Sequence, residues 1–553
     1  MTNKEIALSF DLLAKIMELH QENPFKIRSY QNAYLVLRKM DKPLAEFTME
    51  ELMEVKGIGA AIAEKIQSLV RTGHMPTLDK YLAKTPPGVV EMLKLQGLGP
   101  KKIEIIWKEL GIESPGELLY ACNENRLVEL KGFGEKTQHK TIEAIGFLES
   151  NLGKYLFAQA GFHANQIIEL IHKLQNSSRS IITGPLRRGM AIVERADILT
   201  TCEKPEITRL SDSGLSWTLQ DDTFWEGIWN EFLPVRFHFV GDAGWISRLV
   251  ETTGPATYTG QFKDKFLEMD SLSEESFFIA PGLPFLTPEL RDIPETYTYS
   301  REQLDQLIQP QDIRGVIHCH STYSDGIHSM KEMVLYAKKL GYSYLVITDH
   351  SQAAVYAKGM KPDRLMAQWE EIDQINQSLD DFYLFKGIEC DILSDGSLDY
   401  DENILTRFDL VIASIHSAFQ MDEEKATRRM IKAIENPYTN IIGHPTGRLL
   451  LSREGYPLDF NRIIDACKAN QVAIELNANP QRLDLDSSFI PGCVKQGVFI
   501  SINPDAHSRS SIADISYGVI AARKGLLPKK LCLNHLNKDE LMKFCKKKDI
   551  KPS

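Results

Sequence analysis

The stretch Gly315 to Asp325, GVIHCHSTYSD, decides the fold and the chemistry of the C-terminal half of the chain. Its apolar beginning, Val316-Ile317, is typical of a buried strand, and His318 and His320 follow at the end of that strand. Residues two apart on a strand project to the same face, so both imidazoles can bind one metal ion while Cys319 points away. A single His-x-His pair is more often structural, so the prediction depends on whether the pattern recurs.

The pattern does recur, because later apolar runs also end in residues that bind metals. These runs are YLVITDH, YLFKGIE, LVIASIH, NIIGH and VFISINPDAH, which end at His350, Glu389, His416, His444 and, in the last run, Asp505 and His507. One further run, VAIELN, ends at Glu475 to Asn477 without an obvious ligand. Helix-like segments separate the runs, at 330–340, 362–379, 423–435 and 458–470. This alternation predicts a parallel (βα)7-type barrel over residues 311–553, with a polynuclear metal centre at the C-terminal ends of its strands.

Length and composition predict a soluble protein of several domains. The chain has 553 residues, of which 43% are hydrophobic and 25% charged, and single cores seldom extend beyond about 250–300 residues. No apolar run has the length of a membrane span and no signal peptide is recognisable, so we expect a cytoplasmic protein without a membrane partner. The eight cysteines form no Cys-x-x-Cys pair, which favours a reducing compartment and no disulfide partner. The oligomeric state that we expect is a monomer.

A short theme recurs three times in the helical N-terminal region. The sequences VKGIGAAIAEKI, LQGLGPKKIEII and LKGFGEKTQHKTI each place a Gly-x-Gly turn between an apolar residue and the start of a helix. Glycines let a backbone approach closely, and N–H groups at a helix N-terminus suit a phosphate oxygen, so such turns can hold DNA without reading its bases. A single Gly-x-Gly is more often a plain helix-helix turn, but three copies favour DNA binding despite a net charge of −11. The candidate DNA-binding residues are Gly57, Gly59, Gly97, Gly99, Gly132 and Gly134.

The C-terminal motifs carry a family resemblance. HCHSTYSDG, ITDHS, GIECDIL, IASIHS, GHPTGRLL, ELNANPQRLDL and PDAHS together resemble the polymerase and histidinol phosphatase (PHP) domain, in the form fused to bacterial and archaeal DNA polymerases of family X. The resemblance implies a distorted barrel with up to three divalent metal ions. It also implies nine ligands, which are His318, His320, Asp325, His350, Glu389, His416, His444, Asp505 and His507. A set so rich in imidazole suits Mn²⁺, Zn²⁺ or Fe²⁺ rather than Mg²⁺ alone.

Four further residues of the barrel are weaker candidates. Asp349, beside His350, and Asp391, two residues after Glu389, could support the metal site or be solvated carboxylates at strand ends. Arg448 and Arg482 are candidate phosphate-binding residues near the mouth of the barrel.

The rest of the chain resembles the other domains of these polymerases. In that family, a lysine after the first hairpin forms a Schiff base with the 5′-deoxyribose phosphate left by base-excision repair, and the matching residue here is Lys65. A supporting lysine of the animal enzymes is replaced by Ala61, and Lys65 could equally be a solvated helix residue. The resemblance implies an all-α region made of a lyase-like domain at 1–80 and a fingers-like domain at 81–150, both with helix-hairpin-helix elements. An α+β, nucleotidyltransferase-like palm at 151–232 and a thumb-like region with its linker at 233–310 then precede the PHP domain at 311–553.

The palm keeps the family's phosphate-binding turn but not its paired carboxylates. In IITGPLRRGMAIVERADIL, Gly184, Arg187 and Arg188 match the turn as a remnant nucleotide-phosphate site. The family's two aspartates hold two Mg²⁺ ions from one face of a strand, and here they align with Arg195 and Asp197. Asp197 is thus a remnant palm carboxylate, and a cation stands in place of its partner.

Other positions of the polymerase site depart as well. The third aspartate aligns with Pro234, TGQ at 259–261 replaces a Thr-Gly-Ser turn, and Lys265 stands where the family has asparagine. Asp242 could be proposed as a substitute, but it lies past the strand in a turn. One aspartate of three cannot support two-metal phosphoryl transfer, so we predict a polymerase fold without polymerase activity and without Mg²⁺ in the palm.

These observations predict a DNA-repair enzyme whose barrel hydrolyses DNA phosphodiesters as a 3′-5′ exonuclease, with metal ions generating hydroxide from water. Its DNA partner would be a gapped, nicked or 3′-end structure held by the backbone. One alternative is an active gap-filling polymerase of base-excision repair with an associated 3′-5′ exonuclease, and another is a phosphatase of small phosphoesters. The lysines at 546–548 indicate no more than a solvated helix face.

Overall fold

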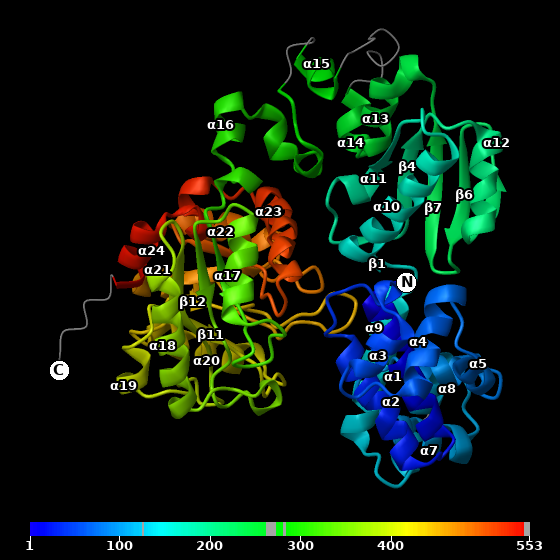
Figure 1. Ribbon diagram of the computed structural model, residues 1–553, viewed down its shortest axis with the longest axis horizontal. Coiled ribbons are helices and arrows are strands. Elements are labelled where there is room, and N and C mark those ends of the chain that lie inside the picture. The colour runs from blue at the N-terminus through cyan, green and yellow to red at the C-terminus, as the bar shows by residue number, and fades with distance from the viewer. Residues whose placement is uncertain (124–125, 262–272, 280–283, 547–553) are drawn as a thin grey trace. The chain divides into compact units, whose positions relative to one another are not determined.

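The computed structural model describes residues 1–123, 126–261, 273–279 and 284–546. It divides into two compact units, Met1–Gly153 and Lys154–Ser553 (Figure 1). Lys265 and the lysines at 547 and 548 lie outside the described residues. The domain boundaries drawn inside each unit remain predictions.

The described residues of the first unit are helical, as the sequence predicts. Its first helix begins at a capping box, in which the Thr2 hydroxyl and the Glu5 carboxylate each accept a backbone N–H. One hydrophobic core extends through the unit, from Ile6 to Ile145. The helices are α1 (Asn3–Leu19), α2 (Pro24–Leu37), α3 (Met49–Glu54), α4 (Ala60–Thr72), α5 (Pro76–Leu82), α6 (Pro87–Met92), α7 (Pro100–Leu110), α8 (Pro115–Asn123) and α9 (Glu135–Asn151).

The second unit begins with a mixed sheet between two layers of helix. Its strand order is β2-β4-β7-β6-β5, and only β4 and β7 run parallel. Neighbouring residues of β4 face opposite sides, so Ile198 joins the core under α10 and Leu199 joins the cluster with Trp245 of α13. The elements are α10 (Phe157–Leu174), β2 (Ser180–Thr183), α11 (Gly184–Arg187), β4 (Ala196–Thr200), β5 (Leu215–Gln220), β6 (Phe224–Trp229), β7 (Leu233–Phe239) and α13 (Trp245–Thr253).

The C-terminal part of this unit is a nearly closed barrel of seven parallel strands, as predicted. The strand order is β14-β13-β12-β11-β10-β9-β8. Backbone hydrogen bonds from His320 to Ala506 and from Ala506 to His318 join the two ends of the sheet. The strands are β8 (Gly315–Cys319), β9 (Tyr344–Ile347), β10 (Tyr383–Asp391), β11 (Leu410–Ser414), β12 (Ile441–Ile442), β13 (Ala473–Asn477) and β14 (Ile500–Asn503).

Helices cover the outside of the barrel (Figure 1). The predicted helical segments are present, and their ends differ from the prediction by two residues or fewer. The helices are α17 (Met330–Lys339), α18 (Pro362–Gln377), α20 (Glu423–Glu435), α21 (Phe460–Asn470), α22 (Ile490–Gln496), α23 (Ile515–Lys524) and α24 (Lys538–Lys546). Because helices cover its outer face, the sheet is apolar on both sides, and β8, β9, β11, β13 and β14 are buried at every residue.

Ion pairs connect the barrel to the preceding segment. On α23, Arg523 Nε donates to Glu289 Oε1 at 2.6 Å and Lys524 Nζ to Asp292 Oδ2 at 2.9 Å. The other oxygen of Asp292 accepts from Arg188 Nε of the palm turn, also at 2.9 Å. Asp292 therefore joins the palm turn to the barrel.

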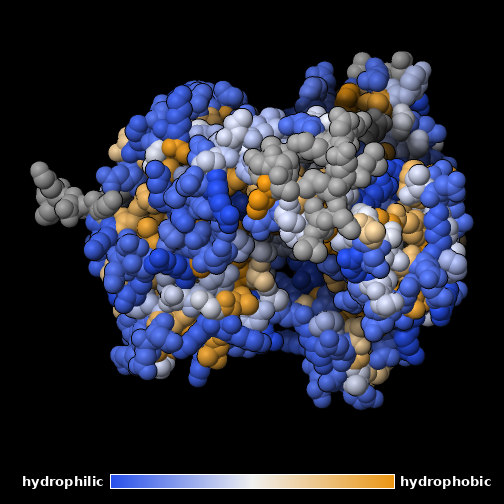
Figure 2. Space-filling view, turned by 90° about the horizontal axis from the view of Figure 1, so that it is seen from above, coloured by the Kyte–Doolittle hydropathy of each residue, from blue (hydrophilic) through white to orange (hydrophobic). Residues whose placement is uncertain are grey.

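The helices, the surface and the cysteines bear on membrane spans, hydrophobic patches and disulfides, respectively. No helix among the described residues combines the length and the apolar character that crossing a membrane needs. Figure 2 shows hydrophobic side chains scattered among hydrophilic ones on the visible face, which is usual for protein surfaces. All eight cysteines fall within the described residues, and none of them forms a disulfide.

Leucine truncation tests the packing of the barrel against its helices. Leu345 of β9 is fully buried in a cluster with Met333 and Val334 of α17, so we expect Leu345→Ala to lower the free energy of unfolding by about 2–5 kcal/mol. Leu335, on the same helix, is 54% exposed, and Leu335→Ala should change it by less than about 0.5 kcal/mol. Urea denaturation followed by circular dichroism gives both values, and equal losses would contradict this packing.

Candidate metal centre

The ends of the barrel strands bring all nine predicted ligand residues together. The structure groups eight of them in three sets whose candidate donor atoms lie within 4.8 Å of one another. The sets are His320, Asp325, His350 and His507, then His318, His320 and Asp505, and finally His350, Glu389 and His416. The ninth residue, His444, adjoins the third set, since its Nε2 lies 3.0 Å from Glu389 Oε1. The nine-ligand assignment itself remains a proposal.

Buried polar atoms within this cluster have no hydrogen-bond partner among the described residues. They are His318 Nε2, His320 Nδ1, His350 Nδ1, Glu389 Oε2 and His444 Nδ1. Leaving such groups unpaired costs about 1–3 kcal/mol each. Imidazole nitrogens and carboxylate oxygens are donors for divalent metals, so the residues present fit a metal centre.

Backbone strain is concentrated at the same residues. His318, His444 and Asp505 have φ angles of +66°, +22° and +51°, in a region that residues other than glycine rarely adopt. Strain of this kind costs on the order of 1–3 kcal/mol per residue and is common at functional sites.

The side chain of Cys319 lies in the hydrophobic cluster outside the barrel, beside α17. This agrees with the prediction that Cys319 points away from the metal site.

Glu475 is the functional residue that sequence reasoning missed. Its carboxylate lies 2.5 Å from His318 Nδ1 and also accepts the backbone N–H of His444, at 2.6 Å, and the amide of Asn503, at 2.7 Å. It therefore positions two candidate ligands at once and holds Nδ1 of His318, so that Nε2 is left for a metal ion. A glutamate inside an otherwise apolar strand was the available signal, because an unpaired carboxylate is rarely buried.

The two auxiliary carboxylates have different surroundings. Asp391 Oδ1 lies 2.7 Å from Nδ1 of His416 and orients that imidazole. Asp349 contacts no imidazole nitrogen in the described hydrogen-bond network. It instead accepts from Ser321, Ser324 and Gln368, and so fixes the loop that follows β8.

Within the cluster, the electrostatics favour an ionised Glu389 beside a protonated His416. Burial alone would raise the pKa of Glu389, but the imidazoles of His416 and His318 hold this pKa well below its usual value. Burial also opposes protonation of His416, yet Glu389 and Asp391 raise the pKa of His416 to about 10. A metal ion that binds His416 must therefore displace a proton.

The two candidate phosphate-binding arginines differ in what already binds them. The guanidinium of Arg448 donates to the carbonyls of residues 482 and 483 and to Asp486 Oδ2. Arg482 Nε lies 3.9 Å from Oδ2 of the candidate ligand Asp505. Arg482 therefore adjoins the metal centre, whereas Arg448 fixes a loop.

In the palm, the remnant carboxylate contacts one arginine and one histidine. Asp197 is 3% exposed, and its carboxylate lies 3.2 Å from Arg195 Nε and 3.1 Å from His238 Nε2. Pro234 lies on β7, as the alignment of the strand predicts. Asp242 lies elsewhere, where it pairs with Arg179 at 2.6 Å and is 86% exposed. No group of metal-ligating side chains found among the described residues includes Asp197.

The palm turn is likewise engaged in ion pairs. Arg187 donates to both oxygens of Glu274, at 2.9 and 2.7 Å, and Arg188 donates to Asp292. Gly184 has a φ of +65°, and a Cβ there would lie 2.8 Å from Asp197 Oδ2. The assignment of this turn to nucleotide phosphate remains a prediction, since carboxylates neutralise both arginines.

The three helical hairpins repeat one geometry. The first glycine of each turn has a positive φ, of 97° at Gly57, 81° at Gly97 and 91° at Gly132. The residue between the two glycines is buried and both glycines are exposed in every copy. Gly59 and Gly99 are the N-caps of α4 and α7, and Gly134 directly precedes α9. Exposed N–H groups at these helix starts suit a phosphate oxygen.

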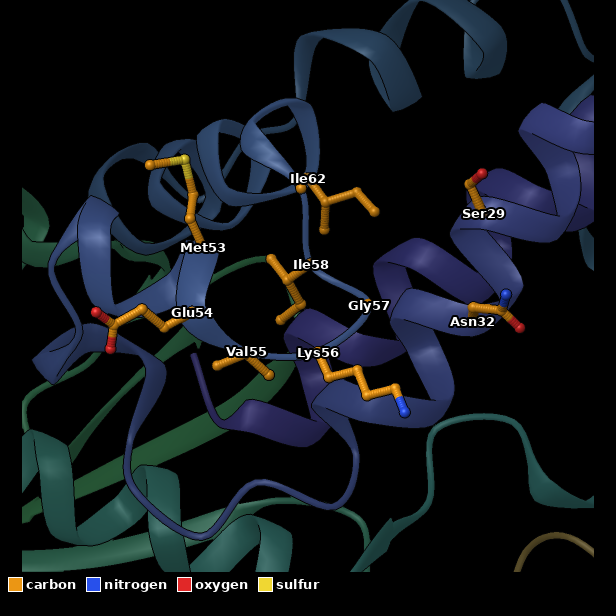
Figure 3. A pocket seen from close by; sticks show the side chains of 10 residues that line it. Ser29, Asn32, Met53, Glu54, Val55, Lys56, Gly57, Ile58 and Ile62 are labelled. Atoms are coloured by element: carbon orange, nitrogen blue, oxygen red, sulfur yellow. The ribbon is translucent and has the colours of Figure 1, made fainter.

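The first hairpin borders a groove of about 520 Å³. Figure 3 shows the hairpin loop on one side of the groove and Ser29 and Asn32 of α2 on the other. Lys65 is the sixth residue of α4, where its amine donates to the Ala61 carbonyl at 3.1 Å and lies 5.9 Å from the Tyr30 ring centre. A Schiff-base role for Lys65 remains a prediction.

Known proteins match the chain in the same arrangement. Residues 1–75 match the helix-hairpin-helix domain, 89–146 the SAM-like helix-hairpin-helix tandem and 317–479 the PHP domain. A Bacillus subtilis protein named DNA polymerase/3'-5' exonuclease PolX is 34% identical over 99% of this chain and 100% of its own length. Proteins named probable phosphatase from Caldicellulosiruptor bescii and Caldicellulosiruptor saccharolyticus are each 30% identical over 35% of this chain, covering 80% and 81% of their own lengths.

The role of Glu475 predicts an effect on metal binding. Glu475→Gln keeps the shape of the side chain but removes the charge that holds His318, so we expect Mn²⁺ affinity to fall about 10- to 100-fold. The matched control is Glu423→Gln at the exposed start of α20, which should bind Mn²⁺ as the unchanged chain does. Isothermal titration calorimetry measures both, and equal affinities would remove Glu475 from the metal centre.

Proposed function

This chain belongs to the family X DNA polymerases that carry helix-hairpin-helix domains and a C-terminal PHP domain, and from that premise we propose that its barrel hydrolyses DNA phosphodiesters at 3′ ends. The observation that supports this most directly is the gathering of nine imidazole and carboxylate side chains at one end of the barrel. Clusters of divalent ions on such ligands are typical of phosphoester hydrolysis.

The side chains of the cluster have separate tasks in this reaction. The nine candidate ligands would hold up to three divalent ions, Mn²⁺, Zn²⁺ or Fe²⁺, which supply positive charge to the phosphate and lower the pKa of water. Glu475 holds His318 and Asp391 holds His416, so that both imidazoles keep fixed orientations. Arg482 would bind a non-bridging phosphate oxygen next to Asp505.

Hydrolysis at a 3′ end would combine cleavage by the barrel with DNA binding by the helical hairpins. The bond from phosphorus to the 3′ oxygen of the preceding nucleotide would break. Water would supply an oxygen to phosphorus and a proton to the leaving oxygen, releasing a nucleoside 5′-monophosphate. The three helical hairpins would hold the DNA by its phosphates, as their exposed glycine turns suggest.

We further propose that the palm does not polymerise. Two-metal phosphoryl transfer needs several carboxylates facing one side of the sheet, whereas Asp197 is neutralised by Arg195 and lies beside His238. The arginines of the palm turn are paired with Glu274 and Asp292. These pairs support a structural role for the palm, whose turn is joined to the barrel through Asp292.

A second candidate function is hydrolysis of a small phosphoester. The two relatives named probable phosphatase favour it, because they match about the length of the barrel alone. Hydrolysis of a free monophosphate that greatly exceeds cleavage of a DNA end would establish that function in place of the exonuclease.

The main proposal predicts a defined outcome on DNA. With Mn²⁺ and an end-labelled gapped primer-template, we expect the primer to shorten whether or not nucleotides are present. His318→Ala removes a fully buried candidate ligand and should abolish shortening. Denaturing gels measure both. Primer extension that survives His318→Ala would contradict an inactive palm, and shortening that survives it would remove the barrel from the reaction.

The assignment of Arg482 predicts a loss of activity on DNA. Arg482→Ala removes a charged hydrogen-bond donor beside the metal centre, so kcat/KM on the same primer should fall about 10- to 100-fold. Arg462→Ala is the matched control, because Arg462 lies on α21 and pairs with Glu424 at 2.7 Å. Mn²⁺ affinity should stay unchanged in both variants, and a loss of metal binding in Arg482→Ala would assign the effect to Asp505 instead.

A further inference from the structure

An exposed aromatic residue adjoins the metal centre and has no role in the chemistry described so far. Tyr356 is 69% exposed, and its ring centre lies 6.0 Å from the imidazole of His350 and 6.3 Å from that of His416. Its neighbour Val355 is 81% exposed. Two adjacent large apolar side chains therefore face solvent beside candidate metal ligands.

The loop that carries these residues is closed at its base. Ser351 and Met360 form a bridge, and Met360 N donates to His350 O at 2.8 Å. A Cβ at Gly359 would lie 1.9 Å from the Ser351 carbonyl, so only glycine permits this close approach. The loop is therefore tied to the candidate ligand His350 itself.

Packing within the loop also explains the exposure of its tip. Ala354 and Ala357 are buried, and Ala353 N donates to Asp399 Oδ2 at 2.7 Å. The small residues on either side of Val355 and Tyr356 thus face inward and leave the two large side chains outside. Exposure of the pair follows from the architecture of the loop.

The charges that follow the tip suit a polyanion. Lys358 and Lys361 are exposed, and Arg364 follows in the first turn of α18, next to Asp363. No acidic residue occurs between Gln352 and Pro362. A cationic segment next to the metal centre favours a ligand with further phosphates beyond the one at the metal centre. An aromatic ring among cations is typical of sites that bind single-stranded nucleic acid.

We propose that Tyr356, supported by Val355, is a positioning residue on which the base of the 3′-terminal nucleotide stacks while its phosphate lies over the metal centre. The inference rests on the proposed exonuclease function and specifies its substrate as an unpaired 3′ end. Stacking tolerates any base, so the residue adds affinity without sequence preference. The ring is the active part of the side chain, and the hydroxyl is dispensable.

A double comparison of enzyme and substrate tests the proposal. One single-stranded oligonucleotide ends in a normal nucleotide, and a second ends in a tetrahydrofuran residue that lacks the base. Tyr356→Ala should lower kcat/KM on the first about 5- to 100-fold, the effect of losing one stacked base. On the second, wild type and Tyr356→Ala should be equal. Tyr356→Phe should match wild type on both, and Leu335→Ala, exposed on α17, should be neutral.

A direct measurement of stacking needs no catalysis. With 2-aminopurine as the 3′-terminal base and EDTA present, binding to wild type and to Tyr356→Phe should quench its fluorescence, and binding to Tyr356→Ala should not. Equal quenching by all three proteins would overturn the proposal. So would a loss in Tyr356→Ala of the same size on both oligonucleotides, or a loss in Tyr356→Phe as large as that in Tyr356→Ala. If wild type quenches but shortens neither strand, the exonuclease function fails while the stacking site remains.

Discussion

The barrel depends on one electrostatic constraint, which is the burial of Glu389 and Glu475 at the end of an otherwise apolar sheet. Both carboxylates are 1% exposed or less, and a buried charge without partners would cost several kcal/mol. Imidazoles from four other strands or their following loops surround them. His318 contacts both, His416 and His444 contact Glu389, and His350 lies 3.0 Å from Glu389 as well. Parallel strands make this possible, because their C-terminal ends all meet at one end of the barrel.

The same constraint explains why strain is tolerated there. His318, His444 and Asp505 hold positive φ angles at the ends of three different strands. Each is fixed from outside the backbone, His318 and His444 by Glu475 and Asp505 by Asn477, whose amide donates to Oδ2 at 3.1 Å. The strained backbone turns these three side chains toward the centre of the cluster. The regular backbone of a strand would not direct all three there. Carboxylates that orient ligands therefore also stabilise the backbone that presents them.

The extent to which the sequence predicts this arrangement depends on what each pattern encodes. Strand-helix alternation and ligand-type residues at strand ends were sufficient for the barrel and for the gathering of eight candidates, because period and position determine which end of a strand a residue occupies. The ninth candidate, Asp325, came from the family resemblance. Glu475 was not predicted, since its role depends on a hydrogen bond to His318, which is 157 residues away in the chain. The same holds for Arg448, a candidate phosphate-binding residue from its place in the sequence, whose guanidinium donates to backbone carbonyls in the fold. Hydrogen bonds between polar groups that are far apart in the chain produce no periodic pattern in the sequence.

In the palm, ion pairs within the chain hold both Asp197 and the arginines of the palm turn. Asp197 is buried, so its carboxylate needs partners; Arg195 supplies a positive one at 3.2 Å, and Nε2 of His238 lies 3.1 Å away. Arg187 and Arg188 in turn bind Glu274 and Asp292, and Asp292 also binds Lys524 of the barrel helix α23. That helix begins eight residues after His507, a candidate ligand. Arg188 therefore connects the palm turn, through Asp292, to the helix that follows the loop of the candidate ligand His507. This connection is the structural role that we propose for a palm that does not polymerise.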